Sequence, residues 1–358
     1  MAKKALIAMS GGVDSSVAAL LMKDKGYDCV GVTMKLFEND DVGESGDRPC
    51  CSLDDAEDAS RVAQSLGMPF YIFDFSSDFR RQVMDRFARS YVNGATPNPC
   101  IDCNRYIKYE RLFRRADALG FDLLVTGHYA RVERDEASGR FLLRTAADAA
   151  KDQSYVLYTL TQEQLARVAY PLGSLNKTEV RRIAEDNGFV NARKRDSQDI
   201  CFVRDGAYGD FIEEYTGMRY APGDFVDEEG RTLGRHGGII RYTIGQRKGL
   251  GQAWGRPMYV IEIRPETNEV VLGGNDALFR RELVARDVNM IAAEHIAKPM
   301  RVCAKIRYSQ AAMPATAVQT DDDEIKVVFD EPQRAVTKGQ AVVLYDGDVV
   351  VGGGVISG

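Results

Sequence analysis

The chain has 358 residues, of which 44% are hydrophobic and 28% are charged, and its formal net charge is −6. This length favours two or three domains, and the composition is that of a globular protein able to bury apolar cores. The acidic balance argues against a general, sequence-blind nucleic-acid binder but leaves room for a local basic surface, and no apolar run is long enough to predict a membrane span.

The first 130 residues alternate between strand patterns and helix patterns. Strands are predicted at Lys4–Met9, Asp28–Phe37, Pro69–Phe75 and Phe121–Thr126, and helices at Ser15–Lys25, Leu53–Leu66, Asp78–Val92, Arg105–Leu119 and Asn176–Asn187. Strands separated by helices at this spacing predict an α/β fold with a doubly wound parallel sheet. The apolar run behind Lys3 and Lys4 is too short for a signal peptide, so we expect a first strand in a cytoplasmic protein.

The character of the sequence changes after Cys201, where short strand-like runs with Gly-rich turns take over. These runs are Ile239–Ile244, Met258–Ile263, Val270–Leu272, Arg301–Tyr308, Ile325–Phe329 and Ala341–Tyr345. The part from Phe279 onward predicts a terminal β-barrel or β-sandwich, preceded by a small mixed domain. The predicted domains are therefore residues 1–203, 204–275 and 276–358, the last a C-terminal β-barrel.

The strongest motif joins the first strand to the first helix and reads Met9-Ser10-Gly11-Gly12-Val13-Asp14-Ser15-Ser16. The two glycines let the backbone approach phosphate oxygens, and the helix start offers unpaired N–H groups and the positive end of a dipole. The string lacks the ending of a Walker A loop and the G-x-G-x-x-G fingerprint of dinucleotide-binding proteins. A phosphate-binding loop is predicted, and a simple capped turn is the structural alternative.

Two thiols three residues apart lie in Asn98-Pro99-Cys100-Ile101-Asp102-Cys103-Asn104, just before a helix pattern that opens at Asn104 or Arg105. A helix N-terminus and nearby cations favour the thiolate. The spacing alone allows half of a zinc or iron–sulfur site, a redox pair, or a nucleophile with an incidental neighbour. Zinc is disfavoured because the chain has only three histidines and no second Cys-x-x-Cys. A third thiol, Cys201, lies at the join to the next domain, where either a cleft position or simple core burial is expected.

Six motifs occur in one order along the chain. They are Ser10–Ser15, Asn98–Asn104, Thr126-Gly127-His128-Tyr129-Ala130, Lys151-Asp152-Gln153-Ser154, Ser197-Gln198-Asp199-Ile200-Cys201-Phe202 and Tyr242-Thr243-Ile244-Gly245-Gln246-Arg247-Lys248-Gly249-Leu250-Gly251. The first resembles the pyrophosphate loop of the ATP pyrophosphatases. Together the six resemble the tRNA-specific 2-thiouridylases, which make 2-thiouridine at the wobble position.

The resemblance implies that ATP, with Mg²⁺, is held by a loop-centred set: Ala8, Met9, Ser10, Gly11, Gly12, Val13, Asp14, Ser15, Met34 and Gly127. It also implies that the uracil 2-oxygen attacks the α-phosphate and pyrophosphate leaves. Sulfur would arrive as a persulfide on Cys201, supplied by a donor protein such as a cysteine desulfurase or a relay protein. Cys103 matches the nucleophile, which frees the sulfur by forming a disulfide with Cys201 or helps to expel AMP.

The sequence departs from the family at Cys100, where many members carry aspartate. The change removes a carboxylate that could assist proton transfer or contact the base. It also creates a set of three thiols, Cys100, Cys103 and Cys201, which resembles the iron–sulfur ligands of related thiolation enzymes. The sequence leaves a disulfide and a cluster open.

The segment between Arg231 and Arg256 holds six Lys or Arg and no Asp or Glu, with Tyr242 and Trp254 among them. Such a local excess fits phosphate contacts, and an aromatic ring can stack an exposed base; a solvated basic face is the alternative. By resemblance, the tRNA-contacting residues are Asn98, Pro99 and Cys100 at the target base, His128, Lys151, Asp152 and Gln153 at the anticodon region, and Arg307, Tyr308 and Gln340 in the terminal barrel. A structural role is the alternative for His128.

Two rival functions remain at this stage. An ATP pyrophosphatase acting on a small molecule explains the loop but leaves Cys103, Cys201 and the basic segment without a use. A non-catalytic RNA-binding protein that uses ATP as a switch is disfavoured by the cysteine pair.

Overall fold

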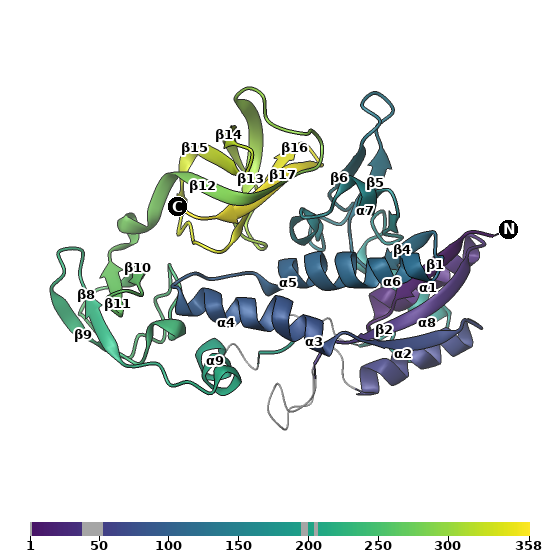
Figure 1. Ribbon diagram of the computed structural model, residues 1–358, viewed down its shortest axis with the longest axis horizontal. Coiled ribbons are helices and arrows are strands. Elements are labelled where there is room, and N and C mark those ends of the chain that lie inside the picture. The colour runs from purple at the N-terminus through teal and green to yellow at the C-terminus, as the bar shows by residue number, and fades with distance from the viewer. Residues whose placement is uncertain (1, 38–52, 195–199, 204–206) are drawn as a thin grey trace. The chain divides into compact units, whose positions relative to one another are not determined.

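The computed structural model describes residues 2–37, 53–194, 200–203 and 207–358, and it divides into two compact units (Figure 1). Unit 1 contains Met1–Val83, Cys100–Phe202 and Asp348–Val351. Unit 2 contains Met84–Pro99, Val203–Gly347 and Gly352–Gly358. Within the described residues, no helix has both the length and the apolar character needed to cross a membrane.

Unit 1 is built on a five-stranded sheet whose pairings are all parallel. The strands are β1 (Lys4–Ala8), β2 (Asp28–Lys35), β3 (Phe70–Asp74), β4 (Leu123–Thr126) and β7 (Val168–Ala169), in the order β3-β2-β1-β4-β7. Four of the five residues of β1 are buried, as expected for a central strand covered on both faces. The predicted parallel α/β sheet is therefore confirmed.

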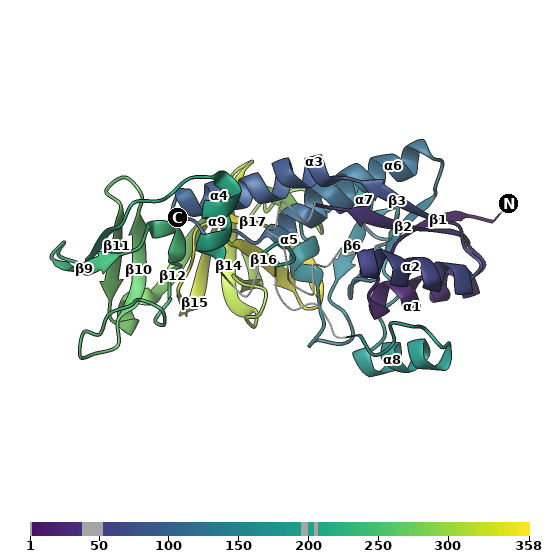
Figure 2. The ribbon, with the colours of Figure 1, turned by 90° about the horizontal axis from the view of Figure 1, so that it is seen from below.

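Helices cover both faces of this sheet (Figure 2). The helices α1 (Val13–Asp24), α2 (Leu53–Ser65) and α8 (Lys177–Asp186) lie on one side, and α6 (Phe113–Ala118) lies on the other. Helix α1 fully buries Val17, Ala18 and Ala19 against the strands, because small and β-branched side chains allow close packing on a flat surface. The doubly wound arrangement follows from this two-sided cover.

Two predicted helices contain π-helical turns. The first consists of α3 (Ser76–Phe79), η2 (Arg80–Met84) and α4 (Asp85–Val92), and the second of α5 (Pro99–Asp102), η3 (Cys103–Leu112) and α6. A π-helix closes its hydrogen bonds over five residues and so changes which side chains share a face. The second helix begins at Pro99 rather than at Asn104 or Arg105. The sequence prediction was wrong here, and both cysteines lie within the helical run.

The rest of unit 1 is made of short elements. They are β5 (Arg131–Arg134), β6 (Phe141–Arg144), η4 (Ser154–Leu157) and α7 (Gln162–Leu165). Strands β5 and β6 form an antiparallel hairpin. Arg131 and Arg144 both pair with Asp348, at 2.7 and 2.6 Å. The Thr145 N–H also donates to the Asp348 oxygen at 2.8 Å, and Val349 of β17 pairs with Arg144 of β6, so the segment Asp348–Val351 belongs to unit 1.

Unit 2 begins with α4, which packs its aromatic side chains on α9 (Tyr208–Thr216). The Phe87 ring lies 6.1 Å from Tyr208 and 6.0 Å from Phe211, and Tyr91 stacks on Tyr208. Aromatic pairs at these separations stabilise a packing interface beyond the area that they bury. Helix α4 therefore belongs to unit 2, although the helix that precedes it belongs to unit 1.

A four-stranded sheet follows in unit 2, in the order β10-β11-β8-β9. Its strands are β8 (Gly223–Val226), β9 (Thr232–His236), β10 (Tyr259–Arg264) and β11 (Glu269–Gly273). The fully buried Phe225 lies at the centre of its core, with the rings of His236 and Tyr242 both 5.3 Å away and that of Trp254 5.7 Å away.

The strand predicted at Ile239–Ile244 is not formed. The structure has a 3-10 turn, η5 (Ile239–Arg241), after Gly238, whose φ of 109° turns the chain. Ile239 and Ile240 are both buried, whereas consecutive residues of a strand point to opposite faces. Tyr242 is buried beside Phe225, so it is not exposed to stack a base, and that expectation was wrong.

The chain ends in a closed β-barrel, preceded by η6 (Asn275–Leu278). The strands are β12 (Phe279–Met290), β13 (Met300–Lys305), β14 (Met313–Asp321), β15 (Glu324–Arg334), β16 (Ala341–Asp346) and β17 (Val349–Ile356), in the order β12-β15-β14-β13-β16-β17. Pairing between β12 and β17 closes the ring. A Cβ on Gly352 would lie 2.5 Å from the Asn289 oxygen, so glycine permits this close approach. The predicted terminal barrel is confirmed.

Phe225→Ala tests whether the aromatic cluster holds the middle of unit 2 together. The change leaves a cavity among His236, Tyr242 and Trp254 and is expected to cost about 3–5 kcal/mol. Trp254 is the single tryptophan of the chain, so its fluorescence during urea denaturation reports this region directly. An unchanged midpoint of the fluorescence transition would contradict the packing described.

Candidate active site

The predicted phosphate loop follows the carboxyl end of β1. At this strand the strand order reverses, because β2 and β3 lie on one side of β1 and β4 and β7 lie on the other. Strand β1 pairs with β2 on one side and with β4 on the other, so the connections from β1 and β4 diverge at this edge. Open α/β sheets bind ligands in the crevice at such a switch point. Residues 8–15 and Gly127 lie there, and Met34 lies at the end of the neighbouring β2. The sheet topology thus brings together residues from three separate segments.

Hydrogen bonds within the loop fix the conformation of the turn between β1 and α1. Gly11 has a φ of +74°, and a Cβ there would lie 2.2 Å from the backbone oxygen of Asp55. The Ser10 N–H donates to Ser15 Oγ at 3.2 Å, and the Ser15 hydroxyl donates to the Gly12 oxygen at 3.0 Å. These contacts fix the backbone in a turn whose glycines keep side chains away from an approaching phosphate.

A buried asparagine, Asn191, also stabilises this loop. Asn191 is 2% exposed, and its Nδ2 donates to the Gly11 oxygen and to Ser16 Oγ, both at 2.9 Å. Buried amides stabilise a turn when their donors are paired, and removing such a partner leaves the backbone acceptor unsatisfied. Asn191 therefore contributes to the shape of the phosphate loop from a segment 180 residues away.

Lys194 ties the same distant segment to α2. Its ammonium pairs with Asp55 at 2.5 Å and Asp58 at 2.7 Å. Burial alone lowers the pKa of Lys194, but the hydrogen bonds to the two carboxylates outweigh it and raise that pKa above its ordinary value. Since the backbone of Asp55 contacts Gly11, this ion pair also braces the phosphate loop.

Gly127 packs against the start of α1. A Cβ at this position would lie 2.7 Å from the Ser15 nitrogen and 2.8 Å from the Asp14 carbonyl carbon. Only glycine allows β4 to end so close to the loop. The structure therefore gives the predicted Gly127 a steric role beside Asp14 and Ser15.

Asp14 is the hydrogen-bonding centre of the site. Both of its carboxylate oxygens accept from Lys177 Nζ, at 2.7 and 2.8 Å, and Oδ1 also accepts from the Tyr129 hydroxyl at 2.8 Å. The Lys177 ammonium lies 5.9 Å from the centre of the Tyr129 ring, within the range of a cation–π contact. One carboxylate thus joins α1, the segment after β4 and the first residue of α8.

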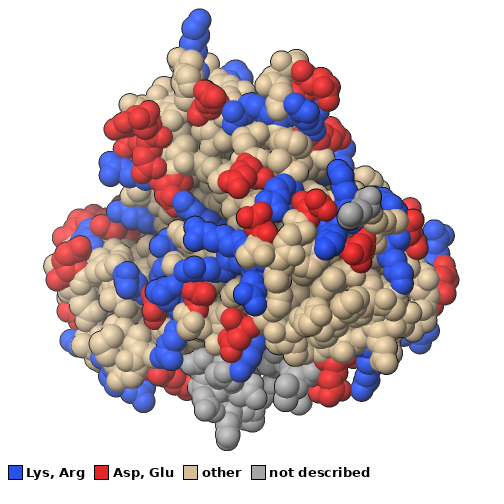
Figure 3. Space-filling model, turned by 45° about the vertical axis from the view of Figure 1, so that its right-hand side comes forward, with Lys and Arg blue, Asp and Glu red and all other residues tan. Residues whose placement is uncertain are grey.

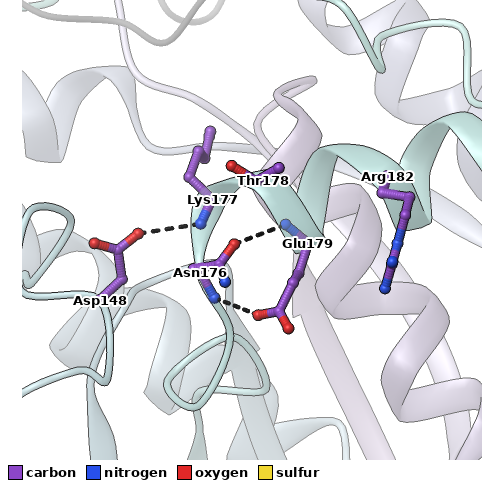
Figure 4. A pocket seen from close by; sticks show the side chains of 6 residues that line it. All are labelled: Asp148, Asn176, Lys177, Thr178, Glu179 and Arg182. Carbon is purple, nitrogen blue, oxygen red and sulfur yellow. Dashed lines mark hydrogen bonds between the residues drawn. The ribbon is translucent and has the colours of Figure 1, made fainter.

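Lys177, Asn191 and Lys194 were not among the residues predicted for the site. The sequence placed a helix at Asn176–Asn187, but no spacing rule connects its first lysine to an aspartate 163 residues earlier. The one local signal was the capping box of Asn176 and Glu179, which fixes where the helix begins and so where Lys177 lies. Figure 4 shows this helix start with the pocket residues Asp148, Asn176, Lys177, Thr178, Glu179 and Arg182.

A second set of hydrogen bonds connects this centre to the helix of Cys103. The Tyr129 N–H donates to Gln153 Oε1 at 3.0 Å, and the Gln153 N–H donates back to the Tyr129 oxygen at 2.9 Å. Next to Cys103, the buried Asn104 donates from Nδ2 to the Val156 oxygen at 3.0 Å. Gln153 immediately precedes η4, which contains Val156. The start of η3 is therefore bonded to η4, and η4 follows the residue that is bonded to Tyr129, the partner of Asp14.

The three predicted thiols differ in exposure. Cys100 is exposed in α5, and Cys103 and Cys201 are half-buried. Phe202, beside Cys201, packs its ring 5.7 Å from Phe79. The predicted motif residues Ser197, Gln198 and Asp199 lie outside the described residues.

The residues do not fit an iron–sulfur cluster. Among the residues that the structure describes, which include all three of these cysteines, no group of three His, Cys, Asp or Glu side chains is placed to hold a metal ion. Cys100, Cys103 and Cys201 are therefore not arranged as a ligand set in the described part of the chain.

His128 lies in a buried polar cluster. Its Nδ1 lies 2.7 Å from Thr126 Oγ1 and 3.1 Å from the Tyr109 hydroxyl, and its Nε2 lies 3.5 Å from Lys108 Nζ. Burial, reinforced by the Lys108 charge, lowers the pKa of His128 well below its ordinary value. The ring is therefore neutral near pH 7, with Nε2 available as an acceptor facing the Lys108 ammonium.

The other predicted tRNA residues fall in both units. In unit 1, Lys151 is half-buried, and Asp152 accepts from the Ala146 and Ser154 N–H groups, which is a turn-forming role. In unit 2, the half-buried Asn98 and the buried Pro99 follow a segment held to the barrel, since Gln340 Nε2 donates to the Thr96 oxygen at 2.8 Å.

Arg307 and Tyr308 lie beyond the end of β13. The Arg307 guanidinium donates to the Arg334 and Ala335 carbonyl oxygens. Tyr308 is 41% exposed, with Lys305 Nζ 5.6 Å from the centre of its ring. An exposed aromatic ring beside a cation can stack on a nucleic-acid base.

The basic segment of residues 231–256 is partly neutralised in the folded chain. Arg231 pairs with Asp227, Arg235 with Asp224, and Arg241 with Asp210, and these carboxylates all lie outside the segment. Counting charges along the sequence therefore overstated the excess. The exposed Arg247, Lys248 and Arg256 are the more suitable phosphate contacts.

His128→Asn tests the neutral histidine through the pH dependence of stability. The pKa of His128 is lower in the folded chain than in the unfolded chain, so at mildly acidic pH the unfolded chain binds a proton at this histidine that the folded chain does not. The free energy of unfolding is therefore expected to fall as the pH drops from about 7 to about 5. His128→Asn is expected to flatten that fall, whereas His295→Asn, at an exposed position, is expected to leave it unchanged. Equal slopes for the parent and His128→Asn would contradict the assignment.

Comparisons with known proteins follow the same layout. The model of the tRNA methyl transferase HUP domain matches residues 3–205, that of the tRNA methyl transferase PRC-barrel domain matches residues 209–274, and that of the aminomethyltransferase beta-barrel domain matches residues 280–356. The chain is 52% identical to the tRNA-specific 2-thiouridylase MnmA of Clostridioides difficile, over 99% of this chain and 98% of that protein. It is 54% identical to the protein of the same name from Lachnoclostridium phytofermentans, over 99% of each. The chain therefore belongs to the tRNA-specific 2-thiouridylase family.

Proposed function

We propose that this protein is an ATP-dependent tRNA-uridine 2-sulfurtransferase that converts the wobble uridine to 2-thiouridine, with AMP and pyrophosphate as the other products. The observation that carries the proposal is the hydrogen-bonded connection between the phosphate loop and the helix of Cys103. Asp14, Tyr129 and Gln153 form one side of that connection, and Asn104 forms the other. A loop suited to ATP and a cysteine suited to sulfur chemistry are thereby held by one scaffold.

In the first step, the uracil 2-oxygen attacks the α-phosphorus of ATP and the bond to the β-phosphate breaks. The backbone of Gly11 and Gly12, with the N-terminus of α1, accommodates the phosphates as the pyrophosphate leaves. Asp14 is the carboxylate suited to a Mg²⁺ ion, which when bound neutralises phosphate charge. Together with Ala8, Met9, Ser10, Val13, Ser15, Met34 and Gly127, these residues are the proposed nucleotide site.

In the second step, sulfur replaces the activated oxygen. A donor protein loads Cys201 as a persulfide. The Cys103 thiolate attacks the inner sulfur of the persulfide, which is Cys201 Sγ itself, so the bond from Sγ to the outer sulfur breaks, a Cys103–Cys201 disulfide forms and the outer sulfur leaves as hydrosulfide. Hydrosulfide then attacks C2 of the adenylated uracil, and AMP leaves with the former 2-oxygen. An external dithiol reduces the disulfide, which balances the two electrons.

The target uridine must leave its stack to reach the nucleotide. We propose that Asn98, Pro99 and Cys100 contact the base, that His128, Lys151, Asp152 and Gln153 serve the anticodon region, and that Arg307, Tyr308 and Gln340 bind RNA from the barrel. Although the net charge is −6, Lys and Arg side chains gather in a band on the face shown in Figure 3, which suits a phosphate backbone. Because the substrates are tRNA and reduced thiols, we propose that the protein acts in the cytoplasm. We also propose three domains, at residues 1–203, 204–275 and 276–358.

Pyrophosphate release with and without tRNA tests the function. The proposal expects release to depend on unmodified tRNA and to match the amount of 2-thiouridine measured by mass spectrometry when a persulfide donor is present. Release without RNA would instead favour an ATP pyrophosphatase of small molecules, and absence of release would favour a nucleotide-dependent RNA-binding protein.

Cys103→Ser and Cys201→Ser test the two thiols separately. Each change is expected to abolish 2-thiouridine formation, because neither hydroxyl can carry or release sulfur, while ATP affinity stays within about twofold. Cys303→Ser, in β13 of the barrel, is the matched control and is expected to retain activity. Full product formation by either of the first two variants would contradict the mechanism.

A further inference from the structure

Lys177 has a position that the proposed reaction does not yet explain. Its ammonium contacts both oxygens of Asp14, the loop residue assigned above to the metal-bound nucleotide. The lysine side chain is 12% exposed and that of Asp14 is 31% exposed, so the carboxylate is the more accessible partner. A lysine held at a phosphate loop in this way is placed to interact with the same ligand as the aspartate.

The main chain fixes where this ammonium lies. Lys177 is the first residue of α8, its N–H donates to Asp148 at 3.1 Å, and the capping box of Asn176 and Glu179 sets the start of the helix (Figure 4). Helix α8 in turn packs along α1, which carries Asp14. The pairing therefore follows from two packed helices, and it does not depend on a mobile surface side chain.

Electrostatics explains why a cation is needed here. A bound triphosphate brings several negative charges to the N-terminus of α1, where Asp14 already adds one. Without a neighbouring cation, Asp14 and the phosphates repel one another in a partly desolvated site. Lys177 offsets the Asp14 charge in the ligand-free loop, and its ammonium lies beside the carboxylate at the N-terminus of α1, where the phosphates of a nucleotide would gather.

We propose that Lys177 is a further nucleotide-binding residue, which pairs with Asp14 in the empty loop and binds the β- and γ-phosphates of ATP, the part that departs as pyrophosphate. This inference rests on the proposed function, because it takes ATP as the ligand of the loop. It predicts that Lys177 discriminates a triphosphate from a monophosphate, which a purely structural ion pair does not do.

Calorimetric titration of the full chain with α,β-methylene-ATP and Mg²⁺ measures this discrimination without turnover. Lys177→Met is expected to weaken the affinity for this analogue about 10- to 100-fold, the effect of losing a charged hydrogen bond, and to leave AMP affinity within about twofold. Lys177→Arg keeps the charge and is expected to fall between the parent and Lys177→Met. Lys25→Met, the same change at an exposed lysine at the opposite end of α1, is the control and is expected to bind like the parent.

A double-mutant comparison separates direct phosphate binding from support of Asp14. In an Asp14→Asn background, which also removes the risk of leaving a carboxylate unpaired, Lys177→Met is expected to cause a further loss of affinity for the analogue. If Lys177 acts only by holding Asp14, the second change has no additional effect, and that result overturns the inference. Thermal unfolding of each variant checks that the fold persists.

The outcomes for the inference and for the proposed function are distinguishable. If the parent binds the analogue and Lys177→Met binds it equally well, the Lys177 inference fails and the proposed function stands. If the parent fails to bind the analogue at all, both fail. If Lys177→Met loses the analogue selectively while the parent forms no 2-thiouridine, the sulfurtransferase proposal fails and the nucleotide role of Lys177 stands.

Discussion

The carboxylate of Asp14 holds the candidate site together. It receives hydrogen bonds from Lys177 at the start of α8 and from Tyr129 after β4, and it lies in the first turn of α1. A partly buried carboxylate is stabilised when an opposite charge and hydrogen-bond donors compensate its own charge. Here the compensating groups are the Lys177 ammonium and the Tyr129 hydroxyl, which lie more than a hundred residues from Asp14 in the sequence. This one group therefore connects the phosphate loop, the start of α8 and the segment after β4.

The chemistry follows from where the sheet places these groups. Strand β1 lies between β2 and β4, so loops from both halves of the sheet meet at its carboxyl end. Gly11 and Gly127 permit backbone approaches that a Cβ would block, one against Asp55 and the other against Ser15. Asn104 then ties the first turn of η3 to η4. The loop proposed for the nucleotide and the helix of Cys103 are thus connected by hydrogen bonds within unit 1.

The sequence predicted those features that depend on local pattern. The parallel sheet followed from strands spaced by helices, and the turn from β1 into α1 followed from Gly11 and Gly12; that this turn binds phosphate stays a prediction. The π-helical turn at Cys103 was not predictable, because apolar periodicity does not show a shift to five-residue hydrogen bonding. The strand at Ile239 was wrong because Gly238 turns the chain and both isoleucines enter the core. The pairing of Lys177 with Asp14 and that of Arg241 with Asp210 are set by tertiary contacts, which one sequence does not reveal.

The central claim is that Cys103 and Cys201 together deliver sulfur to an oxygen activated on the Asp14 loop. A single turnover without reductant, using chain loaded with persulfide at Cys201, ATP and unmodified tRNA, tests it most directly when the digested protein is examined by mass spectrometry. The account predicts one peptide pair joined through Cys103 and Cys201 for each 2-thiouridine formed. Stoichiometric 2-thiouridine with Cys103 still fully reduced would contradict it.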